Sequence, residues 1–184
     1  MRGLSELEGC VLGYLWKYGA STAYAVRKEL LDSPSSHWSG SAGAIYPLLE
    51  RLERRGVVAS SKGARGDRAH WTYELTDPGR DAFMAWLAPP LAYDIISIAP
   101  DPLRTRMYFL GALSAARRAT FLAQAREKLT AYIKELEALQ VDDDFDRLAN
   151  KGAIRATKAR IAWLDDVQRS LDGAPARPRR KKGR

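Results

Sequence analysis

Residues 39–58 read SGSAGAIYPLLERLERRGVV, and this stretch decides the fold of the first half of the chain. Its apolar residues recur at i, i+3, i+4 and i+7, the spacing of one helix face; they are Ile45, Leu48, Leu49 and Leu52. The opposite face offers Tyr46, Pro47, Glu50, Arg51 and Arg54. A short helix of this kind needs a core on one side and an open surface on the other.

The spacing predicts a helix from residue 43 or 44 to residue 55, and Pro47 constrains where it begins. With Gly43 as the cap, the proline ring would clash with the carbonyl one turn behind it. The helix start is therefore either slightly distorted or shifted toward Tyr46.

The neighbouring segments predict two helices before this one and a hairpin after it. Ser5 and Glu8 stand at capping-box spacing, and Ser21 or Thr22 can cap the next helix. The expected elements are helices at 6–18 and about 22–32, strands at 57–61 and 70–75 around a turn at 62–69, and a helix capped by Thr76. This order is that of a winged helix-turn-helix, whose recognition helix enters the DNA major groove.

The second half of the chain predicts long helices. Asp101-Pro102 and Ser114 are helix-start signals, with a helix expected from Ser114 to about 140 and another ending at 171. Leucines at heptad spacing suggest pairing with a second chain, whereas an intrachain three-helix bundle is the alternative. The residues expected at a dimer interface are Leu122, Leu129, Leu136, Ile161, Leu164 and Leu171.

The predicted fold is therefore mainly α, a winged helix-turn-helix of three helices plus a two-stranded wing, followed by an α-helical dimerisation domain. The expected boundaries are 1–88 for the winged helix, 89–100 for a linker, 101–172 for the dimerisation domain and 173–184 for a disordered basic tail.

The net charge of +8 is unevenly distributed. Residues 173–184 contain six basic and no acidic residues, so the rest of the chain carries only +2. The high isoelectric point is thus weak support for nucleic-acid binding by the folded part. One cysteine and the lack of a long apolar run predict a cytoplasmic protein without a membrane span.

Enzymatic chemistry has little support in the sequence. No P-loop and no grouping of serine, histidine and carboxylate appears. His37, His70 and Cys10 show no paired spacing for zinc, and Asp142–Asp146 lacks the glycine and terminal glutamate of a calcium loop. We therefore expect no catalytic residues, no metal and no cofactor.

Four segments of the first half resemble the PadR-type transcriptional regulators: LSELEGCVLGYL (4–15), ASTAYAVRKEL (20–30), GAIYPLLERLERRGVV (43–58) and WTYELTDPGRDAF (71–83). Residues 102–129 and 159–171 look like the helical C-terminal dimerisation domain of the longer members. Ala23-Tyr24 departs from the family's usual His-Gly-Tyr, so only Tyr24 matches there.

The helix-turn-helix reading and the resemblance together give a candidate DNA-binding set. Arg51 could reach a guanine edge or a phosphate, basic wing residues could meet phosphates, and small residues at 39–44 could let backbone N–H groups approach phosphate. A DNA-facing role for Tyr24 and Tyr46 is implied by the resemblance alone. The set is Tyr24, Ser39, Ser41, Ala42, Gly43, Tyr46, Pro47, Arg51, Lys62, Arg65 and Arg68. The alternative is a solvated helix and hairpin.

The resemblance also implies a partner and a signal. The expected protein is a homodimeric repressor on paired half-sites of double-stranded DNA, released by a small aromatic or cationic effector. Trp16 and Trp163 are the candidate effector-binding residues, with plain core packing as the alternative. The rival function is a winged-helix adaptor that contacts proteins and does not bind DNA.

Overall fold

The structure is a computed structural model that describes residues 3–33, 35, 38, 41–65, 68–91, 93–97 and 100–173. For residues 64, 65, 68, 69 and 94 it describes the backbone alone. The chain divides into two compact units, Met1–Ser97 and Ile98–Arg184, and each is considered by itself.

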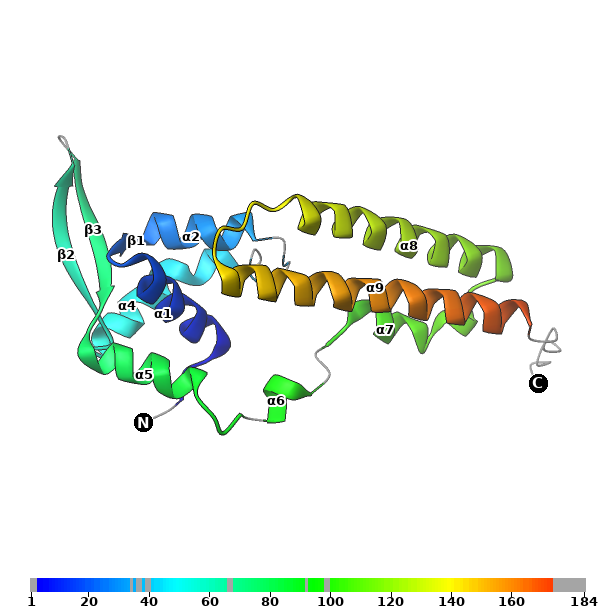
Figure 1. Ribbon diagram of the computed structural model, residues 1–184, viewed down its shortest axis with the longest axis horizontal. Coiled ribbons are helices and arrows are strands. Elements are labelled where there is room, and N and C mark those ends of the chain that lie inside the picture. The colour runs from blue at the N-terminus through cyan, green and yellow to red at the C-terminus, as the bar shows by residue number, and fades with distance from the viewer. Residues whose placement is uncertain are drawn as a thin grey trace, which may run out of the picture. The chain divides into compact units, whose positions relative to one another are not determined.

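The N-terminal unit contains a helical core and a protruding hairpin (Figure 1). Its elements are α1 (Glu6–Tyr18), β1 (Ser21–Thr22), α2 (Ala23–Asp32), the 3-10 turn η1 (Ala42–Ala44), α4 (Ile45–Arg54), β2 (Val58–Arg65), β3 (Arg68–Leu75), α5 (Asp77–Leu87) and α6 (Tyr93–Ile96). The predicted caps are confirmed: Ser5 and Glu8 form both halves of a capping box, and the Thr22 hydroxyl accepts from the Ala25 amide at 3.1 Å.

The start of α4 follows the second of the two expected alternatives. The helix begins at Ile45, after the η1 turn, so that Pro47 occupies its third position. Amides in the first turn have no intrahelical partner, so the N–H that proline lacks is not missed there. The strained start is avoided without losing the amphipathic pattern.

The hairpin is longer than predicted, and the expected turn at 62–69 is wrong. Strand β2 continues to Arg65 and β3 begins at Arg68, with Lys62 opposite Trp71. Backbone pairing alone carries this extension, because the added residues show no apolar alternation. A third strand, β1, pairs with β3, giving the order β1-β3-β2. Two polar residues, Ser21 and Thr22, carry no strand signal in the sequence.

The core of the N-terminal unit lies where α1, α2 and α4 meet the base of the hairpin. It contains the four apolar residues of α4 together with Val11, Leu12, Leu15, Ala23, Val26, Leu30, Ala42, Val57, Val58, Leu75 and Phe83. Helix α5 packs against α1 at Gly9, where an added Cβ would lie 2.3 Å from the Trp86 ring. Only glycine permits this approach.

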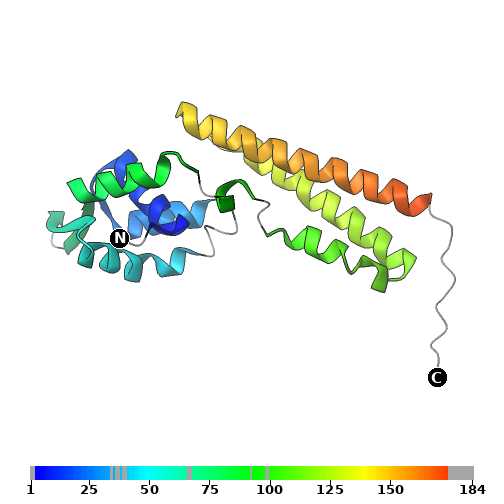
Figure 2. The same cartoon turned by 90° about the horizontal axis from the view of Figure 1, so that it is seen from below.

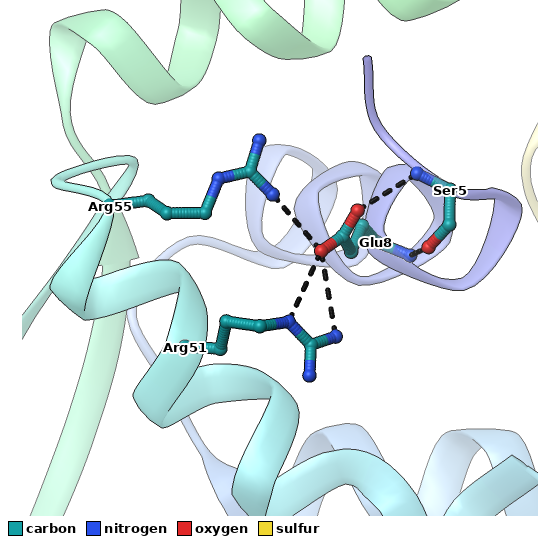
Figure 3. A network of polar contacts seen from close by, with 4 residues as sticks. All are labelled: Ser5, Glu8, Arg51 and Arg55. Atoms are coloured by element: carbon teal, nitrogen blue, oxygen red, sulfur yellow. Dashed lines mark hydrogen bonds and ion pairs between the residues drawn. The ribbon is translucent and has the colours of Figure 1, made fainter. Parts of the chain in front are cut away.

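A buried carboxylate connects α1 to α4 (Figure 3). Glu8 is 1% exposed, and its Oε2 accepts from the Ser5 amide at 2.8 Å. Its Oε1 accepts from Nη1 of Arg55 at 3.0 Å and, more loosely, from Nε of Arg51 at 3.4 Å. The sequence pattern predicted only the capping role of Glu8. These contacts hold the C-terminal half of α4 against the first turn of α1.

The charge of Glu8 is favoured by its surroundings. Burial alone would raise the pKa of this carboxyl group, but the Ser5 amide hydrogen bond, the Arg55 charge and the contacts with the Ser5 hydroxyl and Arg51 outweigh burial, so its pKa lies below 4.5. Glu8 therefore stabilises the fold fully above about pH 4.5, and this contribution is lost as pH falls through the lowered folded-state pKa.

The C-terminal unit is a long helical hairpin with a short helix beside it (Figures 1 and 2). Its elements are α7 (Pro102–Met107), the 3-10 turn η2 (Leu110–Ala112), α8 (Ala115–Ala138) and α9 (Asp144–Asp172). Asp101 caps α7 and also binds Nη2 of Arg160 on α9 at 2.8 Å. Ser114 caps α8, as the start signal predicted, and Asp143 caps α9.

The leucines expected at a dimer interface lie mostly inside one chain. Leu122, Leu129, Leu136 and Leu164 are buried within the C-terminal unit, whereas Ile161 is half-buried and Leu171 is exposed. The heptad spacing thus reflects packing between α8 and α9, which was the alternative reading of that pattern. Of the six predicted interface residues, Ile161 and Leu171 remain accessible to a second chain.

Among the residues that the structure describes, no helix combines sufficient length with sufficient apolar character to cross a bilayer.

We expect Glu8→Gln to lower the free energy of unfolding by about 1–3 kcal/mol at pH 7, because a buried charged hydrogen bond is lost while the arginines can still reach water. The measurement is urea denaturation of the full chain at pH 7 and at pH 3.5. The deficit of the variant should shrink at the lower pH, because below its ordinary pKa the Glu8 carboxyl group binds a proton more readily in the unfolded chain than in the fold.

Glu50→Gln is the matched control, because Glu50 is exposed and should change stability by less than about 0.5 kcal/mol. Equal stability of Glu8→Gln and the parent protein at pH 7 would contradict the role assigned to this carboxylate.

Candidate nucleic-acid interface

The solvent-facing side of α4 has an edge beside the hairpin, an edge beside α1 and an open surface between them. At 100° per residue, Tyr46 and Glu53 lie on the edge nearer the hairpin, and Arg51 and Arg55 on the edge nearer α1. Pro47, Glu50 and Arg54, all exposed, lie between these edges, with the apolar residues on the far side of the helix. This side is the one that a DNA groove would meet.

Arg51 is the predicted site residue whose position changes the interpretation most. About half of its side chain is exposed (48%), yet its Nε and Nη2 atoms both point at Glu8. The helical spacing predicted Arg51 on an open face, but it carries no information on Glu8, which lies 43 residues earlier in the chain. The guanidinium is therefore held as part of the fold before any ligand arrives.

The N-terminal approach to α4 is small and partly open. Gly43 is exposed, and Ser41 is half-buried. Ala42 is 1% exposed and its side chain packs in the core, whereas the prediction for residues 39–44 concerned their backbone N–H groups. Ser39 lies outside the described residues. An exposed backbone at this end of α4 can approach a phosphate closely.

Two tyrosines flank this approach. Tyr46 on α4 is 49% exposed, and Tyr24 on α2 is more exposed still. Helix α2 packs on both η1 and α4, which places the two rings on neighbouring elements. Pro47 is exposed beside Tyr46, so no bulky side chain covers the start of the helix.

The hairpin displays one face that changes from buried to exposed along its length. Leu75 is buried, Tyr73 is half-buried and Trp71 is exposed. Lys62 is exposed and stands opposite Trp71 in the strand register. Arg65 and Arg68 face each other across the end of the ladder, and only their backbone is described. Exposed Trp71 was not among the predicted site residues.

Acidic residues of α4 lie beside the hairpin. The Ser60 hydroxyl donates to Glu53, and burial, Glu53, Glu50 and Tyr46, in that order, raise the pKa of the Tyr73 hydroxyl. Tyr73 therefore stays neutral and can act as a hydrogen-bond donor. Glu50 makes no hydrogen bond or ion pair with the described part of the chain.

The two tryptophans expected to bind an effector belong to different units. Trp16 on α1 is 52% exposed, with its ring centroid 5.9 Å from that of Phe83. Trp163 on α9 is half-buried and packs against the cluster formed by Leu110, Leu122, Leu129 and Leu164. Trp163 is in line with the core-packing alternative, whereas half of the Trp16 side chain is exposed, and the effector role of both residues stays a prediction.

Metal binding finds no support in the described residues. Within those ranges, no group of three or more histidine, cysteine, aspartate or glutamate side chains is arranged to hold an ion.

Comparisons with known proteins match both units. Residues 11–85 match the model of the transcriptional regulator PadR-like family, and residues 101–172 match that of the virulence activator alpha C-terminal domain. No curated protein sequence matches the chain.

Several solved structures share the fold. Bacillus subtilis PadR in complex with operator DNA is 22% identical, with a TM-score of 0.73 over 89% of this chain and 97% of that chain. The PadR-like regulator BC1756 from Bacillus cereus is 21% identical, with a TM-score of 0.70 over 92% and 98%. Bacillus subtilis PadR in complex with p-coumaric acid is 22% identical, with a TM-score of 0.68 over 91% and 96%.

These matches agree with the resemblance seen in the sequence and with the observed order of helices and strands. The winged-helix unit thus carries the sequence signature of the transcriptional regulator PadR-like family, and the C-terminal unit carries that of the virulence activator alpha C-terminal domain.

Proposed function

We propose that this protein is a cytoplasmic, homodimeric DNA-binding repressor that reads paired half-sites with α4 and follows the backbone with its hairpin. The observation that carries the proposal is the uncovered side of α4, with exposed Tyr46 and Pro47 at its N-terminal end and a fully packed core behind it. A helix anchored in this way can enter a major groove without rearrangement.

The proposed contacts divide into positioning and reading. The hydroxyls of Tyr24 and Tyr46 donate to phosphates, while the backbone near Gly43, with Ser39 and Ser41 beside it, approaches the same strand. Lys62, Arg65 and Arg68 on the hairpin meet phosphates or the minor groove. Arg51 mainly orients α4 through Glu8, and its exposed part adds attraction for DNA.

Electrostatics sets how such a protein would bind. The two folded parts, 1–88 and 89–172, carry 11 against 10 and 13 against 12 basic and acidic residues, so each is +1. Nonspecific attraction to DNA by these parts is consequently weak, and the basic segment 173–184 would supply most of it in a salt-sensitive way. Sequence preference must then come from close contacts made by α4.

Dimer formation is proposed from the apolar surface of the C-terminal unit. Phe145 and Leu148 lie one turn apart on α9 and are largely exposed, as are Tyr108 and Phe109 after α7. Exposed large apolar side chains in such groups are typical of interaction surfaces. Pairing through them would place two recognition helices on one DNA duplex, with α8 and α9 setting the distance between them.

An effector is proposed on the strength of the relatives. Bacillus subtilis PadR has been solved both with operator DNA and with p-coumaric acid. In this chain, a small aromatic compound near Trp16 or Trp163 would act by changing the spacing of the two recognition helices. Even a modest tilt of one helix would cost base contacts.

Tyr46→Ala is expected to weaken binding to a specific duplex by about tenfold or more, because a hydrogen bond to a charged phosphate is lost. Fluorescence anisotropy of a labelled duplex, selected with the parent protein, measures this. Tyr46→Phe keeps the ring and removes only the hydroxyl, so it should weaken binding by a similar factor if the hydrogen bond carries the effect. Unchanged affinity in Tyr46→Ala would contradict the proposed contact.

Arg51→Ala should lower both DNA affinity and stability, because Glu8 loses a partner.

The double substitution Phe145→Ser and Leu148→Ser should convert a dimer into a monomer while leaving the helix content intact. Light scattering after size exclusion gives the mass, and far-UV circular dichroism gives the fold. Leu136→Ala is the contrasting variant, since this buried residue should cost about 2–5 kcal/mol of stability without a selective change in mass. A double variant that remains dimeric would rule out this interface.

Addition of p-coumaric acid to the protein–DNA complex should release the duplex and alter tryptophan fluorescence. Trp16→Phe and Trp163→Phe, tested separately, assign the fluorescence change to one unit. An unchanged complex at millimolar compound, with unchanged fluorescence, would reject this class of effector.

A further inference from the structure

The groove-facing side of α4 carries a carboxylate, Glu50, next to exposed Arg54 and Pro47. Glu50 is exposed, lies one helical turn after Tyr46, and stands between the hairpin edge and the α1 edge of the helix. A negative charge here repels every phosphate near it, so it weakens DNA binding unless it has a specific partner.

Three of the four charged neighbours of Glu50 on α4 are engaged elsewhere, and the fourth, exposed Arg54 one turn later, forms no ion pair with Glu50. Arg51 and Arg55 point to Glu8, and Glu53 accepts from the Ser60 hydroxyl. Glu50 itself has no such interaction within the described part of the chain. Its carboxylate is therefore available to a ligand without breaking any contact of the fold.

The chemistry of a carboxylate restricts what it can bind in a major groove. An ionised carboxylate only accepts hydrogen bonds. Guanine presents two acceptors there, thymine one, and adenine an amino group next to the N7 acceptor, which repels a second oxygen. Cytosine presents the N4 amino group with no adjacent acceptor.

We propose that Glu50 is a specificity-determining residue that accepts a hydrogen bond from the N4 amino group of a cytosine in each half-site. The role rests on the proposed function, since it requires α4 to lie in the major groove. It assigns base discrimination to a carboxylate, while the basic hairpin and the tyrosines supply the attraction that offsets its repulsion.

The test is in vitro selection from randomised double-stranded DNA with the full chain, followed by affinity measurements on single-base variants of the selected site. The parent protein should select a cytosine at one position of each half-site. Glu50→Ala should reduce the preference at that position by about tenfold. Glu50→Gln should move the preference toward adenine, because an amide both accepts and donates.

Glu53→Gln is the matched control. It removes one negative charge from the same helix, so any gain in general DNA affinity should resemble that of Glu50→Gln, whereas the preferred bases should not change. Far-UV circular dichroism of each variant confirms that the fold is retained.

The outcomes distinguish the role of Glu50 from the proposed DNA-binding function on which it rests. A selected site that lacks the cytosine, or one that Glu50→Ala selects unchanged, overturns the role of Glu50 and leaves DNA recognition standing. Failure of the parent protein to enrich any sequence overturns the DNA-binding function and the role of Glu50 with it.

Discussion

The arrangement of the N-terminal unit depends on one buried charge, the carboxylate of Glu8. Burying an ion is costly unless donors surround it, and here the Ser5 amide, Arg55 and Arg51 do so. Because the donors come from α1 and from the C-terminal half of α4, the same contacts fix the angle between the two helices (Figure 3). The recognition helix is thereby oriented before it meets any partner.

This constraint also decides which side chains remain for recognition. Arg51 and Arg55 are drawn toward α1, and Glu53 is drawn toward β2 through Ser60. What remains on the outer side of α4 is Tyr46, Pro47, Glu50 and Arg54, a surface on which one acidic and one basic side chain balance. A protein of this design would separate attraction, supplied by the hairpin and the basic C-terminal segment, from discrimination, supplied by α4.

Prediction from sequence succeeded where local signals determine the outcome. Capping residues such as Ser5, Thr22 and Ser114, and the apolar spacing of α4, gave the helices and their buried faces. The length of the hairpin and the strand β1 were missed, because backbone pairing between polar residues leaves no pattern. The partner of Arg51 lies 43 residues away and carries no spacing signal. Leu122 and Leu129 show a seam equally compatible with packing inside one chain or between two.

The most direct test of the account is the affinity of the full chain for DNA taken from immediately upstream of its own coding region. Anisotropy would be measured at several salt concentrations against a scrambled duplex of equal composition. The account predicts a clear preference for the native sequence, together with a steep loss of affinity as salt rises. Absence of binding to either duplex at low salt would contradict it, and would favour a winged helix that contacts other proteins.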